Sequence, residues 1–353
     1  MSRHTQGPLT STARLAGLSG IAIAAALVCG CSGSNDPAAT NGSSEGTGRV
    51  GAASGSGKLN IVTTTAMVTD IVTAVAGDRG VVTGLITGNQ DPHMFTAGSN
   101  DVKKMIGADA VFYTGLMLEG RMADDFARVG RKGNPVFPVT EGLDREKLRE
   151  PPEFEGHWDP HVWMDVELWS ECVAHVAKEL GALDAASSDD YVARADEFRK
   201  QLTELDGYIK KVIATIPKEQ RFLVTAHDAF GYFAQAYGIE VKAIQGISTD
   251  SQAAIADINS LVDFIVENKV PAIFVESSVS QKNIEAVIEG CGSRGWTLKI
   301  GAELYSDAMG KTGSYEGTYI GMMDHNATKI TRSLGGEAPE KGWQGKLSSS
   351  EKD

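Results

Sequence analysis

The sequence predicts an α/β protein of two lobes, each a parallel-type β-sheet flanked by helices, joined by one long α-helix. Three observations predict this fold. Short β-rich runs alternate with helical periodicity from residue 58 onward, one long stretch then keeps a helical pattern, and the alternation restarts after it. We expect an N-terminal lobe at residues 58–186, a linking helix at 187–216 and a C-terminal lobe at 217–334.

In the N-terminal lobe, runs rich in β-branched residues predict strands, and apolar residues at three- and four-residue steps predict helices. The predicted strands are 59–65, 80–86, 110–114 and 135–139. The predicted helices are 67–76, 99–106, 121–129 and 165–181. Strands that alternate with helices favour a parallel sheet, because a crossover is needed to bring each strand back in the same direction.

The linking helix is predicted from a pattern without proline, whose one internal glycine is Gly207. At 1.5 Å per residue the stretch predicts a rod of about 40 Å. Pro217 ends it.

The C-terminal lobe repeats the alternation of strands and helices. The predicted strands are 222–225, 240–243, 272–276 and 297–300. The predicted helices are 229–237, 251–268, 281–289 and 316–333. Residues 335–353 are mostly polar, and we expect them to form a disordered tail.

The first 57 residues have the pattern of an exported, anchored protein. Residues 1–30 hold two arginines ahead of an apolar run that is too short to span a bilayer, which is typical of a signal peptide. The run ends at Gly30-Cys31, which resembles the lipobox of bacterial lipoproteins. Residues 31–57 are mostly small and polar, so we expect a lipidated Cys31 followed by a flexible tether.

Composition limits the partners. The formal net charge is −13, which argues against a nucleic-acid partner and weakly for a cationic solute. The folded region holds only Cys172 and Cys291, which form no Cys-x-x-Cys pair. Each is expected to pack as a small buried residue, although a disulfide between them stays open.

Three histidines stand out because each lies in a loop or just past a predicted strand. His93 and His161 end the same tripeptide, Asp-Pro-His, in which proline fixes the local backbone. His227 follows a buried-looking strand, and ligands of open α/β sheets bind beyond the carboxyl ends of strands. Imidazole binds Mn, Fe, Ni, Cu and Zn well, so the pattern favours a metal site.

Several segments together resemble the motifs of the manganese/zinc (TroA-like) periplasmic solute-binding lipoproteins of metal ABC transporters. They are Gln90-Asp-Pro-His-Met-Phe95, Asp159-Pro-His-Val-Trp-Met-Asp165, Thr225-Ala-His-Asp-Ala-Phe-Gly-Tyr-Phe233, Glu303-Leu-Tyr-Ser-Asp-Ala-Met309 and Tyr315-Glu-Gly-Thr-Tyr-Ile-Gly-Met-Met323. The resemblance runs from about residue 59 to residue 334, with the motifs in the same order. It implies a rigid linking helix and a metal site in the cleft between the lobes.

The resemblance implies four metal ligands: His93, His161, His227 and Asp307. Three neutral imidazoles and one carboxylate suit Zn(II) and Mn(II), and Zn(II) binds such donors more tightly. Zinc members typically carry a histidine-rich loop between the first two ligands, and here only His157 precedes the second motif. The physiological metal, Zn, Mn or Fe, stays open.

The implied function is an extracytoplasmic receptor, monomeric and held at the membrane by its lipid, that delivers Mn(II) or Zn(II) to an ABC transporter permease. The metal is cargo, and no catalytic cofactor is expected. Two alternatives remain at this point: a zinc-dependent hydrolase and a surface adhesion lipoprotein. Four protein ligands argue against the hydrolase, because a catalytic zinc keeps a position open for water.

Overall fold

The computed structural model describes residues 57–250 and 253–348. The expected signal peptide, Cys31 and all but the last residue of the tether lie outside the described residues. Within the described ranges, no helix is both long enough and apolar enough to cross a membrane.

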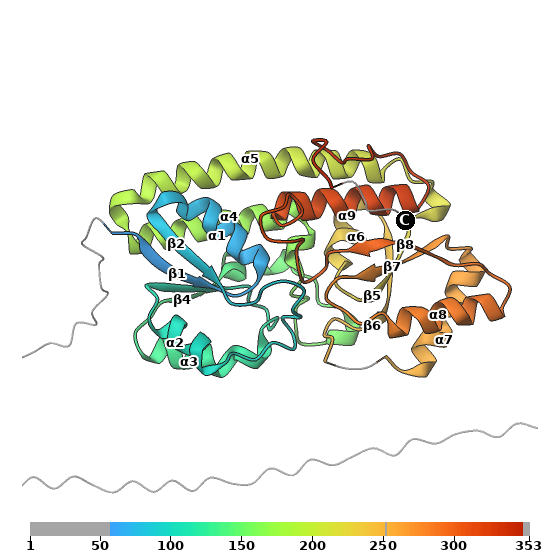
Figure 1. The fold of residues 1–353 in the computed structure, drawn as a ribbon, viewed down its shortest axis with the longest axis horizontal. Coiled ribbons are helices and arrows are strands. Elements are labelled where there is room, and N and C mark those ends of the chain that lie inside the picture. The colour runs from blue at the N-terminus through green and yellow to red at the C-terminus, as the bar shows by residue number, and fades with distance from the viewer. Residues whose placement is uncertain (1–56, 251–252, 349–353) are drawn as a thin grey trace, which may run out of the picture. The chain divides into compact units, whose positions relative to one another are not determined.

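The N-terminal lobe is built on a four-stranded parallel sheet in the order β2-β1-β3-β4 (Figure 1). The strands are β1 (Leu59–Thr63), β2 (Gly80–Gly84), β3 (Ala110–Tyr113) and β4 (Val136–Pro138). The helices are α1 (Ala66–Ala76), α2 (Ser99–Ile106) and α3 (Ala123–Arg131). Each predicted element is present, with bounds that differ by up to two residues. The parallel order follows from the crossover helices.

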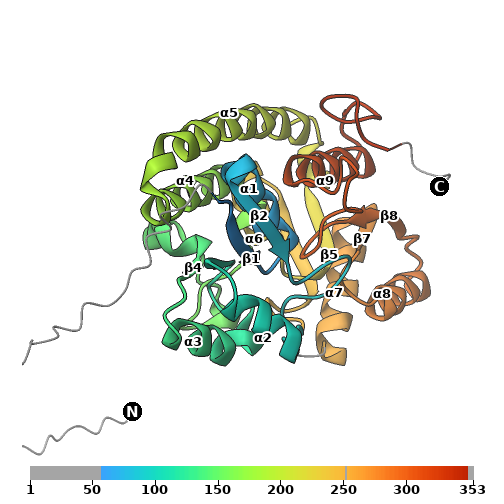
Figure 2. The same ribbon diagram turned by 60° about the vertical axis from the view of Figure 1, so that its left-hand side comes forward.

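The linking helix is α5 (Ser188–Ile213), which follows α4 (Val166–Leu183). Its buried residues include Tyr191, Ala195, Leu202, Leu205 and Ile209, which recur at helical spacing and form one apolar face. This face packs on α1 and α4 of the N-terminal lobe and on α9 (Tyr319–Ser333) of the C-terminal lobe (Figures 1 and 2). One helix therefore runs along both lobes.

The C-terminal lobe contains two parallel strand pairs, β5–β6 and β7–β8. The strands are β5 (Phe222–His227), β6 (Glu240–Gln245), β7 (Ala272–Glu276) and β8 (Lys299–Leu304). The helices before α9 are α6 (Gly231–Tyr237), α7 (Ile255–Asn268) and α8 (Lys282–Ser293). The Glu276 carboxylate at the end of β7 accepts the Ala226 N–H of β5 at 2.7 Å, so the two pairs lie side by side.

The two lobes share one hydrophobic core. The largest cluster of buried residues extends from β1 and α1 through α4 and α5 to α6 and α9. Buried hydrogen bonds reinforce it: the Trp163 indole N–H donates to the Ser306 carbonyl at 3.0 Å, and the Tyr319 hydroxyl donates to the Trp163 carbonyl at 2.7 Å. A continuous core resists wide rotation of one lobe against the other.

The expectation of a disordered tail from residue 335 is wrong for residues 335–348. Leu347 is buried, and the Trp343 N–H donates to the Asp324 carboxylate at 2.9 Å. The Trp343 ring also stacks on Tyr208 of α5. Two apolar side chains and a buried carboxylate acceptor hold this polar-looking segment in place.

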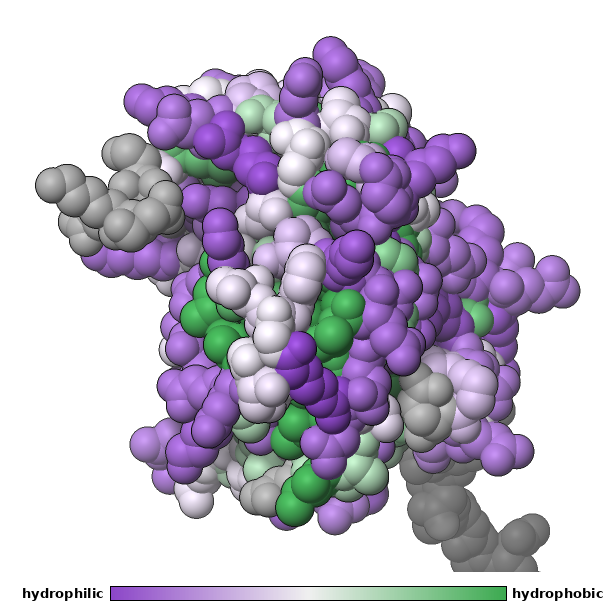
Figure 3. All heavy atoms as spheres, turned by 90° about the vertical axis from the view of Figure 1, so that its right-hand side faces the viewer, coloured by the Kyte–Doolittle hydropathy of each residue, from purple (hydrophilic) through white to green (hydrophobic). Residues whose placement is uncertain are grey.

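The end of the C-terminal lobe presents a largely hydrophilic surface, on which apolar side chains form separate patches (Figure 3). Cys172 and Cys291 are buried and free, so they form no disulfide with each other. Both behave as the small buried residues that the sequence predicts.

Candidate metal centre

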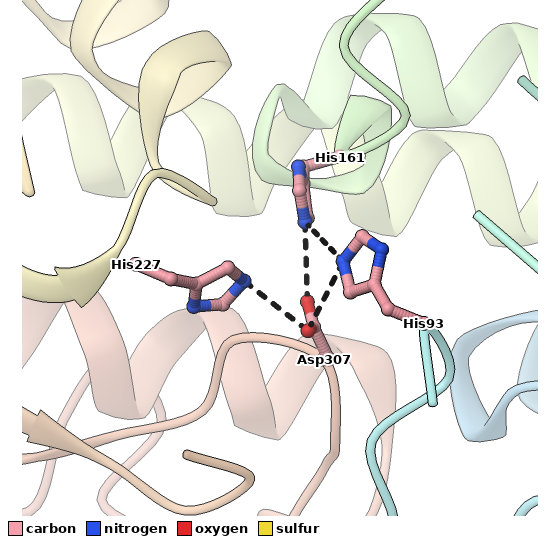
Figure 4. A group of neighbouring side chains, drawn as sticks. All are labelled: His93, His161, His227 and Asp307. Carbon is pink, nitrogen blue, oxygen red and sulfur yellow. Dashed lines mark hydrogen bonds and ion pairs between the residues drawn. The ribbon is translucent and has the colours of Figure 1, made fainter. Parts of the chain in front are cut away.

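The four predicted ligands come from four separate segments and meet at one point (Figure 4). His93 lies in the loop between β2 and α2, and His161 directly precedes a short 3₁₀ turn that leads into α4. His227 is the last residue of β5, and Asp307 follows β8. His227 and Asp307 lie at or just past the carboxyl ends of parallel strands, where open α/β sheets bind their ligands.

One donor atom from each of the four residues lies within 4.8 Å of the others. His93 Nε2 is 3.3 Å from His161 Nε2 and 3.6 Å from Asp307 Oδ2. The Asp307 carboxylate is also 3.4 Å from His161 Nε2 and 3.2 Å from His227 Nε2. Four ligands arranged tetrahedrally about zinc, with bonds of about 2.0–2.1 Å, lie about 3.3–3.4 Å apart. The four separations given above, 3.2–3.6 Å, are close to this spacing, and all the donor atoms lie within 4.8 Å of one another.

The donor atoms are buried, and several of them lack a hydrogen-bond partner in the part of the chain that the structure describes. His161 and His227 are fully buried, His93 is 6 % exposed and Asp307 is 2 % exposed. Within the described residues, three of these atoms make no hydrogen bond of acceptable geometry. They are the two carboxylate oxygens of Asp307 and the Nε2 atom of His227. Leaving buried polar atoms without partners is costly, and a shared cation would satisfy all of them.

Two buried carboxylates orient the imidazoles from behind. Asp159 Oδ1 lies 2.8 Å from His161 Nδ1, and Asp159 Oδ2 accepts a hydrogen bond from Arg149 at 2.8 Å. Glu276 Oε2 lies 2.5 Å from His227 Nδ1. Each carboxylate places the proton on Nδ1 and so leaves Nε2, with its lone pair, directed into the centre.

Asp91 has a different role from Asp159, although both stand in the same tripeptide. Its Oδ1 accepts the backbone N–H of His93 at 2.9 Å and so fixes the loop rather than the ring. The sequence suggests that such an aspartate accepts either a backbone amide or a ligand histidine. Asp159 does both, because it also accepts the His161 N–H at 3.0 Å.

Burial and charge act differently on the four groups. Burial lowers the pKa of His93 to about 3. Burial also opposes protonation of His161 and His227, but Asp159 and Asp307 raise the pKa of His161 to about 9, and Glu276 and Asp307 raise the pKa of His227 well above its usual value. Burial alone would raise the pKa of Asp307, yet His227 and His161 lower it well below its usual value. The carboxylate is therefore ionised and attracts positive charge.

The remaining histidines of the described chain lie outside this group. His157 is exposed and contacts the Phe154 ring, His175 lies beside Glu179 on α4, and His325 Nε2 lies 3.0 Å from the Glu303 carbonyl. Glu276 ends the predicted strand 272–276, a place from which a carboxylate either contacts a ligand imidazole or caps the next turn. The structure gives it the contact with the imidazole of His227.

Comparison with known proteins agrees with the fold. Residues 61–333 match the family described as ZnuA, zinc-uptake complex component A, periplasmic. The chain is 42 % identical over 278 residues to the manganese-binding lipoprotein MntA of Bacillus subtilis, covering 78 % of this chain and 90 % of MntA. It is also 42 % identical over 278 residues to the zinc-binding protein TroA of Treponema pallidum, covering 79 % of this chain and 89 % of TroA.

Among solved structures, the periplasmic zinc-binding protein TroA from Treponema pallidum superposes with a TM-score of 0.76 at 42 % identity. The match covers 79 % of this chain and 99 % of the TroA chain. A family match over most of the described residues and two relatives well above 30 % identity agree with each other, and the chain therefore belongs to the ZnuA family of metal-uptake proteins.

Proposed function

We propose that this protein captures a divalent transition-metal ion outside the cytoplasm and delivers it to the permease of an ABC transporter. The observation that carries the proposal is the buried group of three histidines and one aspartate, whose donor atoms lie within 4.8 Å of one another. Relatives that are 31–32 % identical are named as substrate-binding lipoproteins of metal ABC transporters, which supports a receptor rather than an adhesion protein.

The proposed ligands are His93, His161, His227 and Asp307. Together they offer three neutral nitrogens and one negative oxygen, a set that fills the tetrahedral positions of zinc and leaves none for a catalytic water. The function is binding rather than catalysis, and the family is one of metal-uptake components. The metal is cargo, so the chain needs no catalytic cofactor.

Zn(II) is the ion that the donor set binds most tightly of the two candidates, because affinity at nitrogen donors rises from manganese toward zinc. The two relatives with 42 % identity divide on this question, since one is named manganese-binding and the other zinc-binding. The donor set favours Zn(II) over Mn(II) by affinity, whereas the supply of metal in the host decides which ion is transported.

The proposed N-terminal arrangement completes the receptor. Residues 1–30 direct export, a lipid on Cys31 anchors the chain at the outer face of a membrane, and residues 32–57 leave the folded part free to reach the permease. The folded part acts as a monomer. Cys31→Ser is expected to move the protein from the membrane fraction to the soluble fraction, and light scattering on the folded part is expected to give the mass of one chain.

The site is tested by titrating the metal-free protein with Zn(II) and Mn(II) in a calorimeter. One ion per chain is expected, with binding lost in the His161→Ala and Asp307→Ala variants and retained in the control His157→Ala. Retention of full affinity after loss of either ligand refutes the proposed site. Elemental analysis of the protein purified from its own host identifies the cargo.

A further inference from the structure

One partly exposed segment of the C-terminal lobe reaches across to the N-terminal lobe beside the metal centre. We call residues 246–250 the strap. The Thr249 hydroxyl donates to Asp91 Oδ2 at 2.6 Å. The neighbouring Asp250 carboxylate pairs with the guanidinium of Arg121. Both partners of the strap belong to the N-terminal lobe.

The same two partners also hold the segment that carries His93. The second oxygen of Asp91 accepts the His93 N–H at 2.9 Å. Arg121 Nη1 lies 3.4 Å from the Met94 carbonyl and donates to it. Asp91 and Arg121 therefore each contact both the strap and the backbone at or next to His93.

The strap is attached at its base beside a second proposed ligand. The N–H of Asp228, which follows His227, donates to the Gly246 carbonyl at 3.3 Å. Ile247 is 2 % exposed, so the strap is anchored by one buried side chain. The segment thus connects the neighbourhood of His227 in one lobe to the neighbourhood of His93 in the other.

Two other hydrogen bonds that join the lobes near the site are buried. Trp163, close to His161, bonds the carbonyl of Ser306, close to Asp307. The Tyr232 hydroxyl donates to the Asp159 carbonyl at 3.1 Å. In contrast, the paired side chains of Arg121 and Asp250 are 39 % and 56 % exposed. Exposed contacts open at lower free energy than those within a packed core.

We propose that the strap sets the rate of metal release by holding the His93 segment against the centre, so that His93 is the first ligand to leave when the strap opens. The proposal rests on the proposed function, because it assigns His93 to the ion. It requires no movement of the shared core, since only the strap and the His93 loop change position.

The test measures the rate at which Zn(II) passes from the loaded full chain to a chromophoric chelator in a stopped-flow instrument. Thr249→Val keeps the shape of the side chain and removes its hydroxyl. We expect release to become about tenfold faster, because a hydrogen bond to a carboxylate is lost. Arg121→Met removes the exposed ion pair with Asp250 and the hydrogen bond to the Met94 carbonyl, and is expected to give at least about a twofold effect. The double variant is expected to be at least as fast as Thr249→Val.

Two matched variants control for the substitutions themselves. Thr203→Val removes an exposed hydroxyl on α5 that bonds only within its helix, and Arg128→Met removes an exposed ion pair with Asp125 on α3. Both are expected to release zinc at the original rate. The absorption spectrum of Co(II)-loaded protein reports the donor set and is expected to be the same in all variants.

Each outcome has a defined meaning. Faster release with one ion per chain and an unchanged Co(II) spectrum supports the strap. An unchanged rate in the double variant overturns the strap, even where His93→Ala abolishes binding and so upholds the site. A changed Co(II) spectrum in Thr249→Val also overturns it, because the hydroxyl would then act on the donor set. Failure of the unaltered chain to bind any ion refutes the proposed function and the strap together.

Discussion

Replacing Glu276 by glutamine tests whether a buried carboxylate behind His227 determines metal affinity. In the structure, Glu276 Oε1 accepts the N–H groups of Ala226 and His227, at 2.7 and 2.9 Å, and Oε2 accepts from His227 Nδ1. Glutamine keeps an oxygen for the two backbone donors. Its amide N–H₂ faces Nδ1 instead, which favours the tautomer with the proton on Nε2, the atom directed at the ion.

The expected loss is large because the contact is buried and charged. Removing a partner that orients a ligand histidine costs about 10- to 100-fold in metal affinity, or about 1.4–2.7 kcal/mol. The Glu276 and His227 side chains are both fully buried, which places the effect toward the upper end. Glu276→Ala is a poorer choice, since two buried N–H groups would lose their acceptor at about 1–3 kcal/mol each.

The effect of Glu276→Gln is expected to depend on pH in a stated direction. Burial lowers the pKa of His227, but Glu276 and Asp307 outweigh burial and raise it well above its usual value. In the metal-free protein Glu276 therefore also stabilises a proton with which the metal competes. As pH rises that proton is lost, and only the orienting effect remains. The difference in affinity between the original chain and the variant is therefore expected to grow as pH rises.

The assay is competition for Zn(II) against a fluorescent chelator at pH 7, 8 and 9, together with thermal unfolding of the metal-free and metal-loaded forms. Glu303→Gln, an exposed change at the end of β8, is the matched control and is expected to leave both measurements unchanged. Zinc affinity of Glu276→Gln within twofold of the original at every pH would refute the role of Glu276. Equal loss of stability with and without metal would show that it acts on the fold alone.

Three further predictions follow from burial and charge. Zinc affinity is expected to rise with pH between 6 and 9, and zinc binding is expected to release protons, because the pKa of His161 is raised to about 9. Calorimetry in buffers of different ionisation enthalpy measures the number of protons released, and a value of zero contradicts the prediction. Burial raises the pKa of Asp70 to about 6, so unfolding free energy falls as pH rises from 4 to 6. Asp70→Asn, which still accepts the Tyr319 N–H, is expected to add up to about 3 kcal/mol at pH 7 and nothing at pH 3.5, as urea unfolding at both values would reveal. Deleting residues 337–353 is expected to lower the free energy of unfolding by about 2–4 kcal/mol, because the buried contact of Leu347 and the N–H donor to Asp324 are both removed. An unchanged melting temperature would contradict an ordered tail.

The elements and the three proposed histidine ligands were accessible from the sequence because each leaves a local signal, whereas Asp307 was implied only by the family resemblance. Periodicity marks helices and strands wherever one face is buried, and the proline before His93 and His161 fixes the backbone on the approach to each histidine. His227 stands at the end of an apolar strand. The structure confirms the linking helix and brings the four predicted ligands together.

The parts that sequence reasoning left open or missed depend on contacts between distant residues. Glu276 meets His227 across 49 positions, and Thr249 meets Asp91 across 158 positions. No periodicity encodes such pairs, because they depend on which strands and loops become neighbours. The ordered tail was missed for a related reason: two apolar residues in a polar segment carry little weight until the buried acceptor Asp324 is known.

The shared core has a consequence for how the transporter recognises its cargo carrier. In receptors whose two lobes close around the ligand, binding produces a large change in the angle between the lobes. Here one apolar core, along which α5 runs, joins the two lobes. We therefore expect the metal-loaded and metal-free forms to differ mainly in surface loops. The permease would then have to distinguish the metal-loaded from the metal-free form by small differences in the surface near the metal site.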